Sequence, residues 1–286
     1  MAGESVVGVS NGDTLDASVF ILAGGKGTRM HNSDSPEVDP SLTKILLPVD
    51  DDIYGRAPMV VQALERVSKL SPERVVLLTS SDPLADGDGV EAYAQDWNDS
   101  AHDISLTFVR EERPLGTAGA VRNGLEEIDL LEDSTALIVP SDVILPWQAF
   151  PHIVLQHREA ESDTTWALTS NPGPQAQNTG RIIVDDESGR VLRSLENEPK
   201  EDPASHIELG KRQGMTSIGV VVVNSLAFIE TYDTQFGDMH GARPVDIYRE
   251  YIPAMIDNGI PVQSFDVGVP AQDLGTAERL LRFGRN

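Results

Sequence analysis

Cysteine is absent from the 286 residues, and neither a long apolar run nor a secretory signal is evident. Without cysteine, and with His152 and His157 five residues apart, the chain offers no zinc-binding set. No apolar run approaches the roughly 20 residues that span a bilayer. Residues 1–17 lack a basic start and an apolar centre, so they are expected to form a flexible leader. We therefore expect a cytoplasmic protein.

Positive charge is also scarce, and only five of the 22 basic residues are lysines. The 46 acidic residues give a net charge of -24, which disfavours nucleic acid and membrane surfaces as partners. The acids are spread along the whole chain, which argues against a single docking site for a basic partner. We interpret this acidity as adaptation to a salt-rich cytoplasm, where the screening length falls to about 3 Å at 1 M. An ordinary acidic protein stays open as the alternative.

Short apolar runs alternate with longer amphipathic ones and predict an α/β fold. We expect a Rossmann-like, mixed and mostly parallel sheet flanked by helices, in one domain over residues 18–286. The sequence shows no internal repeat and no β-helix array. The strands are expected at 19–22, 75–78, 104–108, 136–139, 165–168, 181–184, 191–195, 218–223 and 262–265. The helices are expected at 58–70, 91–97, 118–121 onward, 147–158, 245–256 and 276–283.

A glycine-rich turn follows the first expected strand and contains Gly24, Gly25 and Gly27. Glycines let a backbone bend tightly against a ligand and leave its N–H groups free to bind phosphate oxygens. The turn lacks the P-loop pattern, because Gly27 follows Lys26, and it lacks the dinucleotide fingerprint, because Met30 occupies the third small position. It therefore predicts a phosphate-binding turn of neither common type, with an ordinary β-to-α turn as the alternative.

Six motifs follow one another between residues 18 and 283, and the first of them is this turn. They are LAGGKGTRM at 22–30, TKILLPV at 43–49, PLGTAGA at 114–120, VPSD at 139–142, GRIIVD at 180–185 and DLGTAE at 273–278. In this order they resemble the motifs of the sugar-1-phosphate nucleotidyltransferases, which make nucleoside diphosphate sugars. The family has a Pro-Lys pair before an apolar strand. Here Thr43 stands where that family has the proline, and the resemblance implies a strand at 45–49.

The resemblance implies transfer of a nucleotidyl group from a nucleoside triphosphate to a sugar 1-phosphate, with release of pyrophosphate. The attacking phosphate is already ionised, so the reaction needs no general base. It needs cations, backbone donors and Mg²⁺ to bring anions together and to stabilise the leaving group.

Four residues receive catalytic roles from the resemblance. Arg29 suits the β- and γ-phosphates, Lys44 suits the α-phosphate and the attacking oxygen, and Asp142 and Asp273 would hold Mg²⁺. Gly116 would lie beneath the base. The implied nucleotide-binding residues are Leu22, Ala23, Gly24, Gly25, Lys26, Gly27, Thr28, Gly116 and Thr117. Taken singly, the two cations could be solvated surface residues and the two aspartates turn or N-cap residues.

The sugar-binding part is implied for roughly residues 170–270. The family has Glu-Lys-Pro where this chain reads ENEPK at 196–200, and its Asn-x-Gly is Ser217-Ile218-Gly219 here. The sugar-phosphate lysine is therefore missing from its usual place, and Lys200, Lys211 or Arg212 would have to replace it. The implied sugar-phosphate residues are Gly180, Glu196 and Lys200.

Two other functions stay open. A non-catalytic paralogue could bind nucleotide or sugar nucleotide and regulate a partner, as the altered 196–200 region suggests. A related enzyme could transfer a cytidylyl group to a non-sugar alcohol phosphate. The motifs identify neither the base nor the sugar, and they leave open whether the protein is a homo-oligomer.

Overall fold

The computed structural model describes residues 15–25, 42–51, 53–102, 104–130, 134–160, 162–172, 181–197, 212–270 and 272–274. Several predictions lie outside these residues. They concern Lys26, Gly27, Thr28, Arg29, Gly180, Lys200, Lys211 and the expected helix at 276–283.

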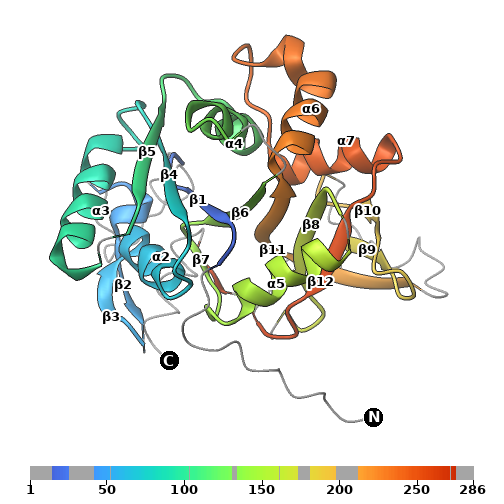
Figure 1. Cartoon of the computed structure of the whole chain (residues 1–286), viewed down its shortest axis with the longest axis horizontal. Coiled ribbons are helices and arrows are strands. Elements are labelled where there is room, and N and C mark those ends of the chain that lie inside the picture. The colour runs from blue at the N-terminus through green and yellow to red at the C-terminus, as the bar shows by residue number, and fades with distance from the viewer. Residues whose placement is uncertain are drawn as a thin grey trace.

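Nine strands in the described part of the chain form one sheet in the order β10-β9-β11-β6-β1-β4-β5, with β8 on β11 and β12 on β8 (Figure 1). Strand β1 pairs in parallel with β4 and β6, and β4 pairs in parallel with β5. Strand β11 runs antiparallel to β6, β8 and β9. The nine strands are β1 (Ser18–Leu22), β4 (Arg74–Ser80), β5 (Leu106–Glu111), β6 (Thr135–Pro140), β8 (Thr164–Thr169), β9 (Ile182–Asp185), β10 (Val191–Ser194), β11 (Arg212–Asn224) and β12 (Gln263–Asp266).

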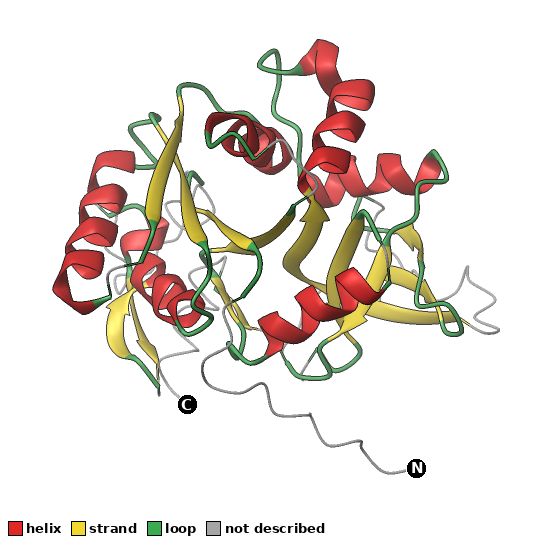
Figure 2. Ribbon diagram, in the orientation of Figure 1, coloured by secondary structure: helices red, strands yellow, loops and turns green. Residues whose placement is uncertain are grey.

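Helices cover both faces of this sheet, as Figure 2 shows. One face carries α2 (Met59–Ser68), α3 (Gly87–Ala101) and α5 (Ala149–Glu159), and the other carries α4 (Gly116–Glu127), α6 (Ser225–Phe236) and α7 (Ile252–Asp257). Alternation along β1 explains the two layers, because Val19 and Ile21 join one buried cluster while Phe20 joins the other. The expected α/β class with a mixed sheet is confirmed.

The remaining described elements are short. Strands β2 (Pro48–Asp51) and β3 (Gly55–Pro58) form a hairpin, and β7 (Val143–Ile144) pairs with β13 (Gln272–Asp273). Two short helices are 3₁₀-helical, η1 (Lys44–Leu46) and η3 (Gly237–Met239), and η4 (Ile247–Tyr251) is a π-helix. No helix among the described residues is both long and apolar enough to cross a membrane.

Three sequence predictions need correction. The strand expected at 45–49 begins only at Pro48, because Ile45 and Leu46 are both buried in a 3₁₀ turn and cannot alternate between two faces. The helix expected at 245–256 starts as the π-helix η4. Strand β11 begins at Arg212, earlier than expected, because its first residues pair with β9.

The chain order of the strands positions the candidate site. From β1 the chain moves outward to β4 and β5, and then returns to β6 on the opposite side of β1. Ligands of open α/β sheets bind at such a reversal, outside the carboxyl ends of the strands. The glycine-rich turn leaves the end of β1, and Asp142 follows the end of β6.

Candidate active site

Two predicted catalytic residues meet at this reversal. Lys44, in η1, donates a hydrogen bond from Nζ to Oδ2 of Asp142, which lies 98 residues further along the chain. The side chains are 11% and 21% exposed, so the ion pair is largely but not completely shielded from solvent.

The turns after β1 and β6 are tied to each other. Ser141 donates to the Leu22 carbonyl from its N–H, at 3.2 Å, and from Oγ, at 2.8 Å. A Cβ on Gly24 would lie 3.4 Å from Oε1 of Glu111, whereas nothing in the described residues lies within 4 Å of a Cβ on Gly25. Among the described residues, the backbone at Gly25 is therefore uncrowded, which suits a phosphate-binding turn.

The backbone of Asp273 lies beside Asp142. Asp273 is paired with Val143 in the β13-β7 ladder, and the Leu274 N–H donates to the Asp142 carbonyl at 2.9 Å. Within the described residues, no three His, Asp or Glu side chains gather as a metal site. Magnesium commonly uses one or two carboxylates together with substrate phosphates, so this pair of aspartates suits it. The metal-binding role of Asp142 and Asp273 stays a prediction.

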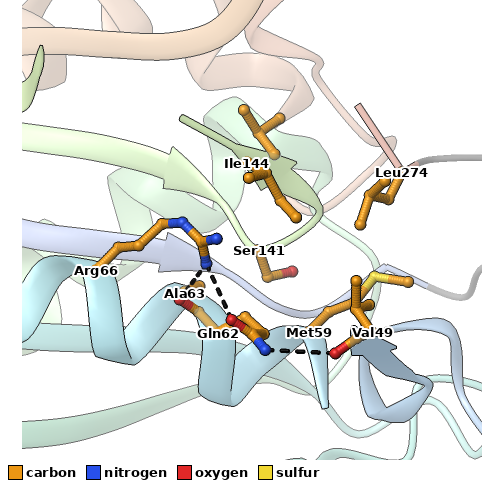
Figure 3. Close-up of a pocket in the computed structure, with 9 residues that line it drawn as sticks. Val49, Met59, Gln62, Ala63, Arg66, Ser141, Ile144 and Leu274 are labelled. Atoms are coloured by element: carbon orange, nitrogen blue, oxygen red, sulfur yellow. Dashed lines mark hydrogen bonds between the residues drawn. The ribbon is translucent and has the colours of Figure 1, made fainter. Parts of the chain in front are cut away.

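A small apolar crevice lies behind Ser141, as the close-up shows (Figure 3). The side chains of Arg66 and Gln62, at its edge, are hydrogen-bonded to other residues of the protein. Arg66 donates to Asp51 and, at 2.7 Å, to the Gln62 carbonyl, while Gln62 donates to the Gly55 carbonyl at 2.7 Å. These bonds fasten α2 to the β2-β3 hairpin, so we assign the crevice a structural role. Its lining residues are Val49, Met59, Gln62, Ala63, Arg66, Ser141, Val143, Ile144 and Leu274.

Gly116 begins α4 with a φ of +76°, a conformation that favours glycine. A Cβ there would lie 2.4 Å from the Val245 carbonyl oxygen. The two segments are bonded, since Ala118 N–H donates to that oxygen at 2.9 Å and Val245 N–H donates to the Leu115 carbonyl at 2.8 Å. This packing alone requires glycine at position 116, whether or not a nucleotide binds there. The location of Gly116 beneath the base stays a prediction.

Thr117 joins the same segment through its side chain. Its Oγ1 accepts a hydrogen bond from the Ile247 N–H at 2.8 Å and donates to Oδ2 of Asp246 at 3.3 Å. Oδ1 of Asp246 caps η4 by accepting from the N–H groups of Tyr248 and Arg249, each at 2.9 Å. Sequence reasoning missed Asp246, although an aspartate just before a helical pattern is an N-cap signature.

Glu196 lies near this capped helix. Burial raises the pKa of its carboxyl, Arg181 and Arg249 lower it in part, and Asp246 raises it. The neighbouring Asn197 donates from Nδ2 to the Arg249 carbonyl at 2.6 Å. The altered 196–200 region therefore begins against η4, next to an exposed arginine.

Sequence comparison identifies several relatives. A mannose-1-phosphate guanylyltransferase of Mycobacterium tuberculosis is 26% identical over 272 residues, which are 94% of this chain and 64% of the relative. The enzyme of that name from Debaryomyces hansenii is 23% identical over 92% of this chain and 62% of its own. The bifunctional protein GlmU of Desulfotalea psychrophila is 33% identical over 65% of this chain and 47% of its own. The chain thus spans less than two thirds of these relatives.

Solved structures share the fold. A Bacillus anthracis protein in complex with sucrose has a TM-score of 0.65 at 18% identity, covering 94% of both chains. HddC from Yersinia pseudotuberculosis, complexed with GMP-PN, has a TM-score of 0.61 at 16% identity, covering 94% of this chain and 98% of its own. The family model described as nucleotidyl transferase matches residues 18–285. With six ordered motifs and this architecture, the chain belongs to the nucleotidyl transferase family.

Proposed function

We propose that the protein transfers a nucleotidyl group from a nucleoside triphosphate to a sugar 1-phosphate. The observation that carries this proposal is the Lys44–Asp142 ion pair at the reversal between β1 and β6. The pair places a cation and a carboxylate beside a glycine-rich turn. Together these groups can bind the two phosphates that the reaction joins. The names of the relatives support this class of substrates.

The chemistry assigns each group a task. An oxygen of the sugar phosphate attacks the α-phosphorus, and the bond between that phosphorus and the β-phosphate oxygen breaks to release pyrophosphate. Lys44 would bind the α-phosphate and the attacking oxygen, and Arg29 would bind the leaving phosphates. The family generally depends on a divalent metal. Asp142 and Asp273 would hold Mg²⁺, which neutralises phosphate charge when it is bound.

On the sugar side we propose Glu196 and Arg249. Asn197 stands in place of the family's lysine, and its amide holds the Arg249 backbone. The exposed Arg249 could therefore supply the missing positive charge, while the Glu196 carboxylate could accept hydrogen bonds from sugar hydroxyls. Arg212 remains an alternative, as do Lys200 and Lys211, which lie outside the described residues.

The test is a panel of triphosphates and sugar phosphates, incubated with the whole chain and Mg²⁺ at low and high salt. GTP with mannose 1-phosphate and dTTP with glucose 1-phosphate belong in the panel. We expect pyrophosphate release and a nucleotide sugar by mass spectrometry. Asp142→Asn and Asp273→Asn should nearly abolish both, whereas the exposed Asp50→Asn should not.

Other outcomes would favour the alternatives. Tight nucleotide binding without pyrophosphate release would indicate a regulatory paralogue. A product formed only from CTP and a non-sugar alcohol phosphate would indicate the cytidylyltransferase.

We also propose that residues 18–286 form one catalytic domain in the cytoplasm and that its acidic surface is an adaptation to salt. The net charge of -24 supports the last point, because salt screens repulsion between surface acids. Stability that rises steeply between 0.1 and about 2 M KCl would agree with it, and stability independent of KCl would contradict it.

A further inference from the structure

The π-helix η4 carries a tyrosine that contacts strand β11 close to the Asp142 turn. In η4, the N–H of Tyr251 donates to the Asp246 carbonyl at 3.0 Å, five residues back. Single π turns are rare and are often found at functional sites. The hydroxyl of Tyr248, on this turn, donates a hydrogen bond to the Gly219 carbonyl.

Gly219 lies in an irregular part of β11. The register with β8 shifts between Ser217 and Val221, and Gly219 has a φ of +78°. Oγ of Ser217 accepts hydrogen bonds from the Gly219 N–H at 3.2 Å and from Nε1 of Trp166 at 3.1 Å. The bulge is thus held by its own sheet on one side and by Tyr248 on the other.

This bulge packs against the residues that bracket Asp142. A Cβ on Gly219 would lie 3.1 Å from Cγ of Pro140 and 3.7 Å from Cγ2 of Val143. Pro140 ends β6 and Val143 starts β7, with Ser141 and Asp142 between them. A displacement of the bulge would therefore change the support of the Asp142 turn.

The electrostatics agree with this placement. Burial raises the pKa of the Tyr248 hydroxyl, and the negative charges of Asp246 and Asp142 raise it further. The hydroxyl consequently keeps its proton and acts as a donor. Asp246 in turn contacts Thr117 of the nucleotide motif, so Tyr248 lies between that motif and the Asp142 turn.

We propose that Tyr248 is a positioning residue for nucleotidyl transfer, which holds the Gly219 bulge against the turn that carries Asp142. It touches neither substrate in this assignment and acts through Gly219 and Pro140. The inference rests on the proposed function. If the wild-type protein transfers no nucleotidyl group, the proposed function is wrong. The role of Tyr248 is tested separately, by comparing its variants with active wild-type protein.

Tyr248→Phe tests the inference, because it keeps the ring beside Trp166 and removes only the donor. The Gly219 carbonyl then lacks its side-chain partner. We expect kcat to fall about tenfold and the half-saturating Mg²⁺ concentration to rise several-fold, with the KM for the triphosphate changed less than about twofold.

Tyr251→Phe is the matched control. Tyr251 belongs to the same helix, is fully buried, and donates to the Phe228 carbonyl at 3.3 Å, which ties it to α6 and not to the Gly219 bulge. Both variants should lower the melting temperature, but only Tyr248→Phe should change kcat and the Mg²⁺ dependence. Equal kinetics in the two variants would overturn the proposal.

A second variant covers the case in which Tyr248→Phe does not fold. Pro140→Ala removes the ring that the Gly219 bulge packs against. We expect the same rise in the Mg²⁺ requirement from this variant. If Pro140→Ala has the same half-saturating Mg²⁺ concentration as the wild type, this result alone would contradict the inference.

Discussion

Lys44 and Asp142 form an ion pair across 98 residues of sequence, at the point where the strand order reverses. The carboxylate has a protein cation as its partner in the absence of substrates. If Asp142 also binds Mg²⁺, the ammonium group and the metal compete for the same oxygens. Metal binding would then release Lys44 toward the phosphates.

Lys44→Met separates the two roles of Lys44, which are to pair with Asp142 and to bind the phosphates. The variant keeps the length of the side chain but loses its charge, so Mn²⁺ or Mg²⁺ should bind the substrate-free protein several-fold more tightly. Turnover should fall about 10²-fold or more, because a cation at the transferred phosphate is lost. Isothermal titration with Mn²⁺ measures the affinity, and the exposed Lys69→Met is the control. Metal affinity unchanged in Lys44→Met would remove Asp142 from the metal site.

Arg249→Gln examines the sugar side. The backbone bonds of Arg249 to Asp246 and Asn197 do not involve its guanidinium, so η4 should survive the substitution. We expect the KM for sugar 1-phosphate to rise about tenfold, with the KM for triphosphate unchanged, because one charge-assisted contact is lost. The exposed Arg190→Gln, in the hairpin between β9 and β10, is the control. An unchanged KM would transfer the role to Lys200, Lys211 or Arg212.

The sequence predicts elements with a local pattern and misses contacts between distant segments. The run at 19–22 became β1 with almost the same bounds, because apolar β-branched residues on both faces need no partner to be recognised. The helix α6 had no predicted counterpart, although its buried Phe228, Tyr232 and Phe236 recur every four residues, as on one face of a helix. The contact between Thr117 and Asp246 spans 129 residues and leaves no local signal.

Thr43→Pro restores the residue typical of the family. The backbone at Thr43 has φ -63° and ψ 150°, which proline adopts without strain. Its side chain is buried, and Oγ1 has no partner among the described residues. We expect the free energy of unfolding, from urea denaturation, to rise by roughly 1 kcal/mol through reduced freedom of the unfolded chain.

Thr164→Val is the control for the stability of Thr43→Pro. Thr164 is buried and its Oγ1 is likewise without a partner in the described part of the chain, so valine removes a hydroxyl without restricting the backbone. A loss of stability in Thr43→Pro alone would mean that the Thr43 N–H is needed as a donor.

Arg66→Met should destabilise the protein strongly. The Arg66 and Asp51 side chains are 5% and 6% exposed, so the variant leaves a buried carboxylate without its cation. Removing one partner of a buried pair costs about 3–5 kcal/mol. The neighbouring pair of Arg56 and Asp50 is 64% and 53% exposed, and Arg56→Met should cost less than about 1 kcal/mol. Equal unfolding free energies of the two variants would contradict this account.

Acid should weaken the fold through His157. Burial lowers the pKa of this imidazole to about 4, and the charge of Arg158 contributes. The ring lies 3.0 Å from Oγ1 of Thr165 in the folded protein, whereas in the unfolded chain its pKa returns to about 6.5. Between these values only the unfolded state binds the proton, so stability falls as the pH drops from about 6.5 to 4, by up to roughly 3 kcal/mol. His157→Gln should flatten this part of the pH dependence of urea unfolding, while His152→Gln, in the same helix, should keep it. The same slope in all three proteins would exclude His157 as the cause.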